Sequence, residues 1–396
     1  MNVEKIRNLA EGVYPWTVDL RRALHRIPEP GFEEFKTQKL ICDTLDALAI
    51  PYETKRTWVV AYLQGAQPGR VVGFRADIDA LPVAEPEGCS FRSQHEGWMH
   101  ACGHDAHTAI QLGVAKILVS MKDRLRGGVK LLFQPAEETE GGAKPMVEAG
   151  VLENPHVDAC YGLHLQSRLP LGAVETRYGT LNASTDDVIL DIRGRGGHAA
   201  YPENSVDAIV CAAHVVTALQ TLVSRNVSPL SSAVLSFGVM EGGRAANIVC
   251  EHVRLKGTLR TADPELRAYL QRRVREVAAG VASAFGGSAE VKILEGYSAL
   301  VNHTREARLV LDTAAALFGA ESVILKDGPS MGGEDFSYFV EKTPGAFYHI
   351  GCTPIEDLPA PALHSPLFRP DERCILTGLM MQTAIALYET GTEDEA

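Results

Sequence analysis

The chain is organised around one dense stretch, Met99-His100-Ala101-Cys102-Gly103-His104-Asp105-Ala106-His107. A thiol, three imidazoles and a carboxylate fall within these nine residues. Cys, His and carboxylate side chains are the ligands of borderline divalent metals such as Zn, Mn, Co and Ni. Gly103 permits the sharp turn that would direct Cys102 and His104 to the same side of the backbone. The stretch therefore predicts a metal site.

Three further segments each place a possible ligand or base at the end of an apolar run: Gln134–Glu138, Gly162–His164 and Leu363–Ser365. With the first stretch they give a predicted ligand set of mixed chemistry, which comprises Cys102, His104, Glu138, His164 and His364. This set is larger than a closed tetrahedral site takes, whereas two hydrolytic metals that share a water need about that many ligands. We therefore expect two divalent metal ions per chain, of the Mn, Zn, Co or Ni class.

Two adjacent carboxylates, Glu137 and Glu138, follow an apolar run that reads as a core strand. Because adjacent residues there point in different directions, one carboxylate can bind metal while its neighbour acts as a general base on water. Asp77, Asp79 and Asp105 are candidates to orient ligand imidazoles by hydrogen bonds. The alternative for each of these three is the cap of a helix or turn, and it is strongest for Asp105.

The length and composition of the chain indicate how many domains it has and which partners it is not expected to bind. A chain of 396 residues predicts two domains. The formal net charge of -12, without a basic block, argues against nucleic acid as a partner. The longest apolar stretches fall short of the roughly 18 residues of a membrane span, so we expect no membrane partner.

Cellular location is predicted from the beginning of the chain and from its cysteines. Residues 1–24 lack the pattern of a secretory signal. The eight cysteines are scattered singly, as expected for reduced thiols in a cytoplasmic protein. Only Cys102 has ligand-type neighbours, so we expect the other seven to be packing residues.

The order of predicted elements indicates an α/β fold with an inserted domain. Up to residue 165, helices alternate with buried strands, which predicts a mostly parallel sheet. In this part we expect a pair of strands, 58–63 and 70–74, joined by a turn at 67–69. From residue 183 the order becomes strand, helix, two strands, helix, strand, the βαββαβ order of the ferredoxin-like fold. We expect its third strand over 248–260. The predicted domains are 1–182 with 295–396, which bind the metals, and 183–294, which is inserted.

Within the inserted domain, His198 lies in a glycine-rich turn whose exposed tip is able to approach a ligand. Asn247 and Arg260 bracket one predicted strand. Their separation of thirteen residues places them on opposite faces of a regular strand. A bulge or a strong twist is needed to bring both to one substrate, so spacing alone does not support a shared role.

Two other functions compete with a metal hydrolase. Gly328–Gly332 matches the GxSxG pattern around Ser330, and Asp335 or Asp357 and then His364 follow in the order of the serine α/β-hydrolases. Against this alternative, Pro329 sits in the turn and the metal-type residues would have no role. The second alternative is a metal-binding protein without catalysis, and the presence of Glu137 argues against it.

With these residues in view, the chain resembles the metallopeptidase-like amidohydrolases, in the branch of aminoacylases, hippurate hydrolases and indole-acetyl-amino-acid hydrolases. The Cys-Gly-His-Asp-Ala-His string is specific to this branch. The motifs of the resemblance span nearly the whole chain and occur in order at His25–Glu29, Arg75–Pro82, Met99–His107, Gln134–Glu138, Gly162–His164, Gly196–Pro202, Gly332–Ser337 and His364.

The resemblance implies an α/β catalytic domain that holds two metals and a lid domain that forms a homodimer. It implies the ligand set given above, with Glu137 as the base. It also implies that His198 serves the oxyanion, reaching the metals of the partner subunit, and that Asn247 and Arg260 serve the substrate carboxylate. The acids of Gly332–Phe336 are implied to be structural or to support the ligands. The expected reaction is hydrolysis of the amide bond of an N-acyl amino acid, of the N-acetyl, benzoyl or indole-acetyl type.

Overall fold

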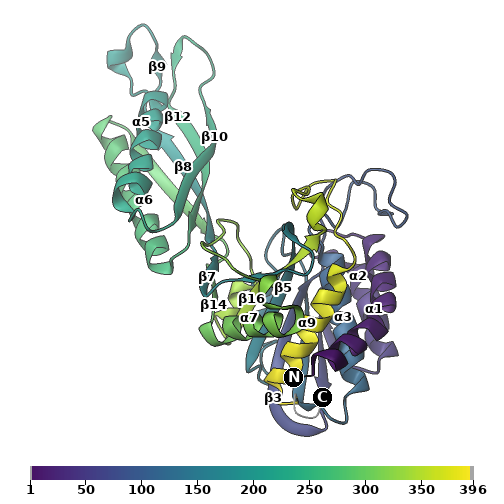
Figure 1. Cartoon of the computed structure of the whole chain (residues 1–396). Helices are drawn as coiled ribbons and strands as arrows, with labels where there is room; N and C mark the ends of the chain where they lie inside the picture. The colour runs from purple at the N-terminus through teal and green to yellow at the C-terminus, as the bar shows by residue number, and fades with distance from the viewer. Residues whose placement is uncertain (1, 393–396) are drawn as a thin grey trace. The chain divides into compact units, whose positions relative to one another are not determined.

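A computed structural model describes residues 2–392 and divides the chain into two compact units (Figure 1). Unit 1 comprises Met1–Gly179, Val301–Gly328 and Asp335–Ala396, and unit 2 comprises Thr180–Leu300 and Pro329–Glu334. The terminal residues 1 and 393–396 of the predicted metal-binding domain lie outside the described part. The short return of the chain to unit 2 has a local cause. Ser330 exchanges backbone hydrogen bonds with Leu181 (2.8 Å) and Ala183 (2.9 Å).

Unit 1 is built on an eight-stranded sheet of order β1-β2-β4-β3-β5-β16-β6-β15. Its central strands are parallel, because β3 pairs in parallel with β4 and β5, and β5 pairs in parallel with β16. The predicted mostly parallel α/β sheet is confirmed. Its strands are β1 (Tyr52–Lys55), β2 (Trp58–Gln64), β3 (Gln67–Asp77), β4 (Arg126–Gln134), β5 (Ala159–Pro170), β6 (Val174–Thr176), β15 (Val323–Leu325) and β16 (Gly345–Thr353).

One local prediction in this sheet was wrong. The strands predicted at 58–63 and 70–74 are not neighbours, because β4 lies between β2 and β3. Residues 67–69, predicted as a turn, already belong to β3. The partner of β2 on its other side is β1, which had not been predicted.

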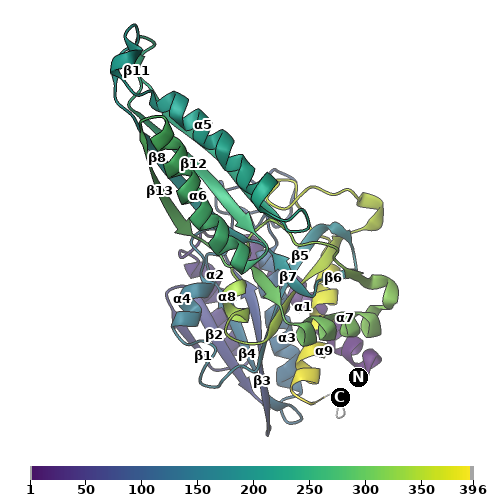
Figure 2. The ribbon, with the colours of Figure 1, turned by 90° about the vertical axis from the view of Figure 1, so that its left-hand side faces the viewer.

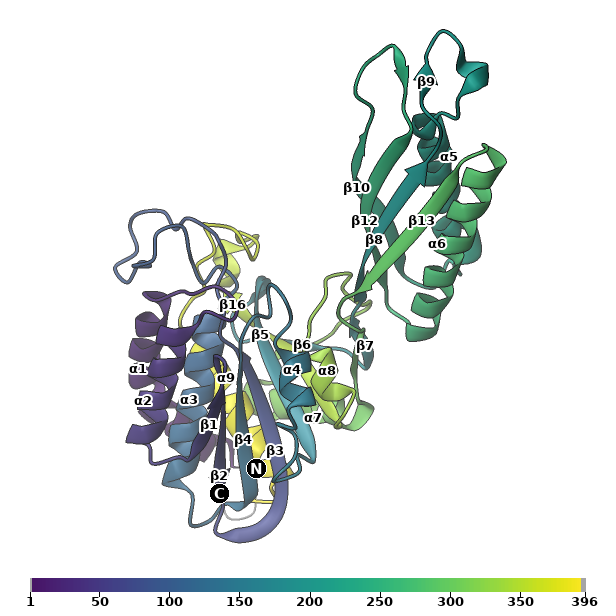
Figure 3. The ribbon, with the colours of Figure 1, turned by 180° about the vertical axis from the view of Figure 1, so that it is seen from behind.

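Helices cover both faces of this sheet (Figures 2 and 3). The short helices α4 (Ala143–Glu148) and α8 (Ser337–Val340) lie on one face. The other face carries the long helices, which are α1 (Val3–His25), α2 (Phe35–Ala47), α3 (His104–Ser120), α7 (Thr304–Phe318) and α9 (Cys374–Glu389). Nearly every residue of α3 and α9 is buried, since these helices pack against the sheet, against each other and beneath α1. The buried helix α3 begins at His104, inside the stretch Met99–His107 that predicts a metal site.

Unit 2 has the predicted element order, β8-α5-β10-β12-α6-β13, in an antiparallel sheet of order β10-β12-β8-β13. Both helices cover one face of the sheet (Figure 2). Their first turns are capped by Asp207 and Asp263, whose carboxylates accept backbone N–H groups. The bounds are β8 (Ser184–Arg193), α5 (Ala208–Thr221), β10 (Ala233–Gly242), β12 (His252–Thr261), α6 (Pro264–Ala284) and β13 (Ser288–Glu295).

The strand predicted over 248–260 is interrupted. It divides into β11 (Ile248–Val249), which pairs with β9 (Gly197–His198), and β12. The break lies at residues 250 and 251, whose carbonyls accept hydrogen bonds from Ala208 and Gly194 (both 2.9 Å) instead of continuing a ladder. The interruption separates the tip of unit 2 from its main sheet.

One helical stretch, Ala208–Asn226, is long and apolar enough to cross a membrane by length and composition. It consists of α5 and its π-helical continuation, Leu222–Asn226. The expectation that no stretch reaches this length was wrong, because uncharged polar residues extend the apolar run. The inner face of α5, which includes Cys211, Val215 and Leu219, is part of the hydrophobic core of unit 2.

Candidate metal centre

Gly103 allows the backbone turn that places Cys102 and His104 at the carboxyl edge of the sheet in unit 1. It is the N-cap of α3 and has a left-handed backbone (φ 92°), which a side chain would strain. A Cβ at this position would also lie 2.9 Å from Cδ1 of Leu165 in β5. The glycine therefore allows α3 to begin tightly against β5, with Cys102 and His104 on either side of the turn.

His104 presents a buried nitrogen to the site. Its Nδ1 lies 3.0 Å from the Asp79 carbonyl oxygen and 3.2 Å from Asp79 Oδ1, so this nitrogen carries the donated proton. Its Nε2 is buried without a hydrogen-bond partner among residues 2–392, 3.7 Å from Asp77 Oδ2 and 3.9 Å from Glu138 Oε1. Burial lowers the pKa of His104, yet the carboxylates of Asp77 and Asp79 raise it to about 10. The carboxylates that favour a proton on this ring would equally favour a divalent cation in its place at Nε2.

Cys102 and His164 face each other, with Sγ 3.3 Å from Nε2. Nδ1 of His164 donates to the Leu165 carbonyl (2.6 Å), which leaves Nε2 as the acceptor atom. Burial and the neighbouring His107 hold the pKa of His164 well below its ordinary value, so the ring is neutral. Burial and the Glu138 carboxylate raise the pKa of the Cys102 thiol. A divalent cation would replace the thiol proton here, since thiolate is the form that binds metals.

Glu138 and His364 complete the cluster. Oε1 of Glu138 lies 3.0 Å from Nε2 of His364. The backbone of His364 is left-handed (φ 67°) and is held by a hydrogen bond from its N–H to the Ala101 carbonyl (2.9 Å). Ala136, directly before the two glutamates, is also left-handed (φ 54°). Such conformations cost on the order of 1–3 kcal/mol outside glycine and are concentrated at functional sites.

The structure thus brings together all five predicted ligands and the predicted base. The ligand atoms of Cys102, Glu138 and His364 lie within 4.8 Å of one another, as do those of His104, Glu137 and Glu138. Glu137 is 8% exposed, so solvent reaches it only at the edge of the cluster. The unpartnered nitrogen of His104, the buried thiol and the carboxylates together fit a centre for divalent metals.

Comparison with known proteins identifies the family. Residues 73–387 match the model of peptidase family M20/M25/M40. The chain belongs to this family. The predicted resemblance to metal-dependent amidohydrolases is confirmed, and neither the serine hydrolase nor the non-catalytic alternative gains support.

Proteins with known sequences and structures align over almost the full chain. An N-acetyldiaminopimelate deacetylase of Streptococcus pneumoniae (strain Taiwan19F-14) is 40% identical over 91% of this chain and 96% of its own. A dinuclear metal-binding peptidase of the M20 family from Bacillus subtilis is 32% identical, with a TM-score of 0.85 over 96% of this chain and 99% of its own. A proposed aminohydrolase of methicillin-resistant Staphylococcus aureus is also 32% identical, with a TM-score of 0.92 over 98% of this chain and 100% of its own.

In this M20 chain the residues around the ligands only partly follow the prediction. Asp79 contacts His104, as expected for an orienting carboxylate. Asp77 bonds instead to His107 (2.6 Å), whose Nε2 accepts the N–H of Leu165 (2.9 Å). Both ring nitrogens of His107 are therefore hydrogen-bonded, and the ring positions the part of β5 that carries His164. No role was predicted for His107, although its position one helical turn after His104 places both on one face of α3.

Asp105, a candidate to orient a ligand imidazole, bonds to none of the five predicted ligands. Asp105 bonds to His25 Nδ1 (2.7 Å) and to Arg21 Nε (2.8 Å), both on α1. Its neighbour His104 faces the metal cluster. Successive residues of an α-helix point about 100° apart, so the two side chains leave α3 in different directions.

The local structure at Ser330 differs from a nucleophile turn. The strand β15 ends at Leu325 and the next α-helix, α8, begins only at Ser337. The acid Asp335 is buried and binds Arg75 (2.9 Å) and Gln134 (2.8 Å), which ties β3 and β4 to the segment before α8. This agrees with the structural role that the resemblance implied for Asp335.

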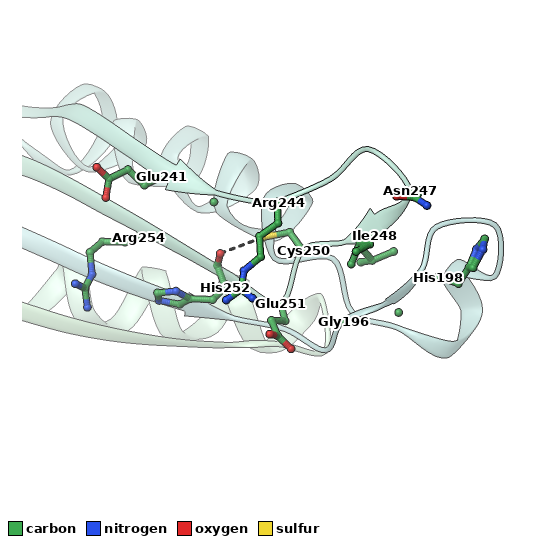
Figure 4. A pocket seen from close by; sticks show the side chains of 14 residues that line it. Gly196, His198, Glu241, Arg244, Asn247, Ile248, Cys250, Glu251, His252 and Arg254 are labelled. Atoms are coloured by element: carbon green, nitrogen blue, oxygen red, sulfur yellow. Dashed lines mark hydrogen bonds between the residues drawn. The ribbon is translucent and has the colours of Figure 1, made fainter.

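The predicted lid residues lie at two ends of unit 2. His198 and Asn247 are exposed at its tip, where Ala199 N–H donates to the Asn247 carbonyl (3.1 Å). They line an open cavity of about 830 Å³ (Figure 4). Arg260 pairs in register with Thr185, at the end of the sheet where the chain enters the unit. Most of β12 separates this end from the tip, roughly 20 Å or more at about 3.3 Å per residue.

Proposed function

We propose that this metal-dependent amidohydrolase of the M20 family removes the acyl group of N-acyl amino acids, with N-acetyl amino acids as its preferred class. The observation that carries the proposal is the buried cluster around His104, in which a nitrogen without a hydrogen-bond partner among residues 2–392 faces carboxylates beside Glu137. The acetyl preference is supported by the 40% identical relative, whose name gives it an N-acetylated amino acid as substrate. Benzoyl and indole-acetyl groups are the competing choices.

The metals would be held by the five clustered side chains, Cys102, His104, Glu138, His164 and His364. Two divalent cations of the Mn, Zn, Co or Ni class would supply Lewis acidity, which polarises an amide carbonyl and lowers the pKa of water. Asp79 would keep His104 in the tautomer that offers Nε2, as carboxylates commonly do behind metal-bound histidines.

Side chains of the protein would then transfer the protons of the reaction and stabilise the charge that develops on the substrate. Glu137 takes a proton from the attacking water and returns it to the leaving amine nitrogen. His198 stabilises the negative charge that develops on the carbonyl oxygen. Asn247 and Arg260 bind the substrate carboxylate. The separation of Arg260 from His198 and Asn247 within unit 2 supports a homodimer, since one substrate can meet all three only if two lids contribute. The cytoplasmic location stays a prediction.

Removal of metal should abolish the activity. Dialysis against a chelator is expected to stop hydrolysis of an N-acetyl amino acid, and addition of Mn, Co, Ni or Zn should restore it, because water is too weak an acid for fast attack without a cation. Turnover and metal content are measured on the same samples. Full activity in a sample shown to be free of metal would disprove the proposal.

The acyl preference is tested by a matched substrate series. Acetyl, benzoyl and indole-acetyl derivatives of the same amino acid, with N-acetyldiaminopimelate added, are compared by kcat/KM. The acetyl compounds are expected to be hydrolysed fastest. A benzoyl or indole-acetyl compound that exceeds them would reassign the acyl group while leaving amide hydrolysis intact.

Cys102→Ser should weaken metal binding strongly. A serine hydroxyl stays protonated near neutral pH, whereas a thiol can bind as thiolate. Metal content after gel filtration is the measurement, and Cys160→Ser is the matched control, because Cys160 is also buried but is in none of the clusters of ligand atoms. Equal metal loss in both variants would show that the ligand set is wrong.

A further inference from the structure

A second cluster of metal-type side chains lies in unit 1 apart from the centre described above. It consists of His25, at the end of α1, and of Glu85 and Cys89, in the loop that connects β3 to α3. One ligand atom from each of the three lies within 4.8 Å of the other two. None of the three belongs to the proposed dinuclear centre. The cluster therefore needs its own explanation.

Each of the two buried members is fixed by a contact on its far side. Nδ1 of His25 lies 2.7 Å from Asp105, which is itself anchored by Arg21 (2.8 Å). Oε2 of Glu85 accepts the N–H of Ser93 (2.7 Å). The remaining atoms, Nε2 of His25 and Oε1 of Glu85, are thereby directed at each other. A carboxylate behind a histidine and a second contact on a ligating carboxylate are typical of metal sites.

The separation of the two facing atoms suits a shared cation. Nε2 of His25 and Oε1 of Glu85 are 3.3 Å apart. Two ligands about 2.0–2.1 Å from one tetrahedral ion are themselves about 3.3–3.4 Å apart. Among residues 2–392, no Lys or Arg side chain pairs with the Glu85 carboxylate. Its Oε1 is paired with Nε2 of His25, so a divalent cation would take the place of the proton that these two atoms share. The thiol of Cys89 supplies a third ligand type.

The cluster is also accessible. Cys89 is half-buried and, with His25 and Glu85, lines a cavity of about 490 Å³. The wall beside His25 is formed by Phe91, whose ring lies edge-on to the imidazole at 5.4 Å between centroids. Three protein ligands at the wall of an open cavity leave the fourth position of a tetrahedral ion to solvent or to a small ligand.

We propose that His25, Glu85 and Cys89 form a third metal site, for a zinc-type divalent cation. The ion ties the loop between β3 and α3 to the end of α1. That loop leads directly into Cys102 and His104, so the third ion would hold the approach to the catalytic ligands in place. Cys89 is then a ligand, which replaces the expectation that it only packs.

Metal stoichiometry tests the site. Cys89→Ser is compared with Cys42→Ser, a matched control because Cys42 is also half-buried but lies in α2. Both variants and the unmodified chain are loaded with zinc, passed through a desalting column and analysed for metal and protein. Cys89→Ser is expected to hold one equivalent less than the other two. Equal metal content in all three would overturn the proposal, whatever the dinuclear centre does.

Alkylation gives an independent measurement. Zinc should slow modification of Cys89 by iodoacetamide at least tenfold and leave Cys42 unaffected, as followed by peptide mass spectrometry. In Glu85→Gln this protection should disappear, because an amide is a poor ligand for the cation. Failure of zinc to protect Cys89, or undiminished protection in Glu85→Gln, would overturn the site.

Discussion

Glu137→Gln is expected to lower kcat for an N-acetyl amino acid by roughly 10²–10⁴-fold or more while the metals stay bound. An amide has nearly the shape of the carboxylate but cannot accept a proton from water and return it to the leaving amine. Because Glu137 would serve both steps, its loss belongs at the upper end of this range. Kinetics and metal content on the same preparation are the required measurements.

Glu138→Gln is the matched control, because it makes the same chemical change one residue later. Glu138 Oε1 lies 3.0 Å from Nε2 of His364 and is part of the ligand cluster with Cys102. This variant should lose metal as well as activity, and added metal should restore part of the turnover. If Glu137→Gln lost metal and Glu138→Gln kept it, the two roles would have to be exchanged.

The position of Glu137 and Glu138 was predictable because they follow an apolar run, and the ends of neighbouring parallel strands meet at one edge of a sheet. Asp77 ends β3 and pairs in register with Gln134, which ends β4 just before the glutamates. Strand ends are visible in the hydrophobic pattern of a sequence. The prediction of a mostly parallel sheet therefore placed the glutamates beside the end of β3, whereas His164 lies within β5 and not at its end, and His364 lies in a turn.

The direction of individual side chains was less predictable. Asp79 and Asp105 were both candidates to orient the predicted ligands, yet only Asp79 contacts one of the five, His104. The difference depends on where α1 packs, since its residues Arg21 and His25 bind Asp105. Tertiary contacts of this kind leave no periodic trace in a sequence. The same applies to the position of β4 between β2 and β3.

The lid residues show a second limit of sequence reasoning. Spacing suggested that Asn247 and Arg260 lie on opposite faces of one strand. The structure places them at opposite ends of unit 2, and the predicted strand is interrupted between them at residues 250 and 251. The interruption is caused by backbone hydrogen bonds to Gly194 and Ala208, which are distant in sequence. A pattern of side chains could not have indicated it.

This separation leads to the prediction with the largest expected effect. If His198 acts in the active site of the partner subunit, two inactive variants should complement each other. Glu137→Gln removes the base and His198→Ala removes the proposed oxyanion donor, so each homodimer should be nearly inactive. After subunit exchange, a heterodimer contains one site with an intact Glu137 from one chain and an intact His198 from the other.

Activity should therefore reappear on mixing, to about half the wild-type value per heterodimer, because one of two symmetric sites is complete. Exchange is verified by mass spectrometry of differently tagged chains, and kcat is measured on the purified heterodimer. A double variant with both changes in one chain, mixed with wild type, is the control. It leaves no complete site if His198 acts across the interface, and one complete site if it acts within its own chain. A verified Glu137→Gln/His198→Ala heterodimer without activity, together with an active control, would place His198 in its own subunit's site.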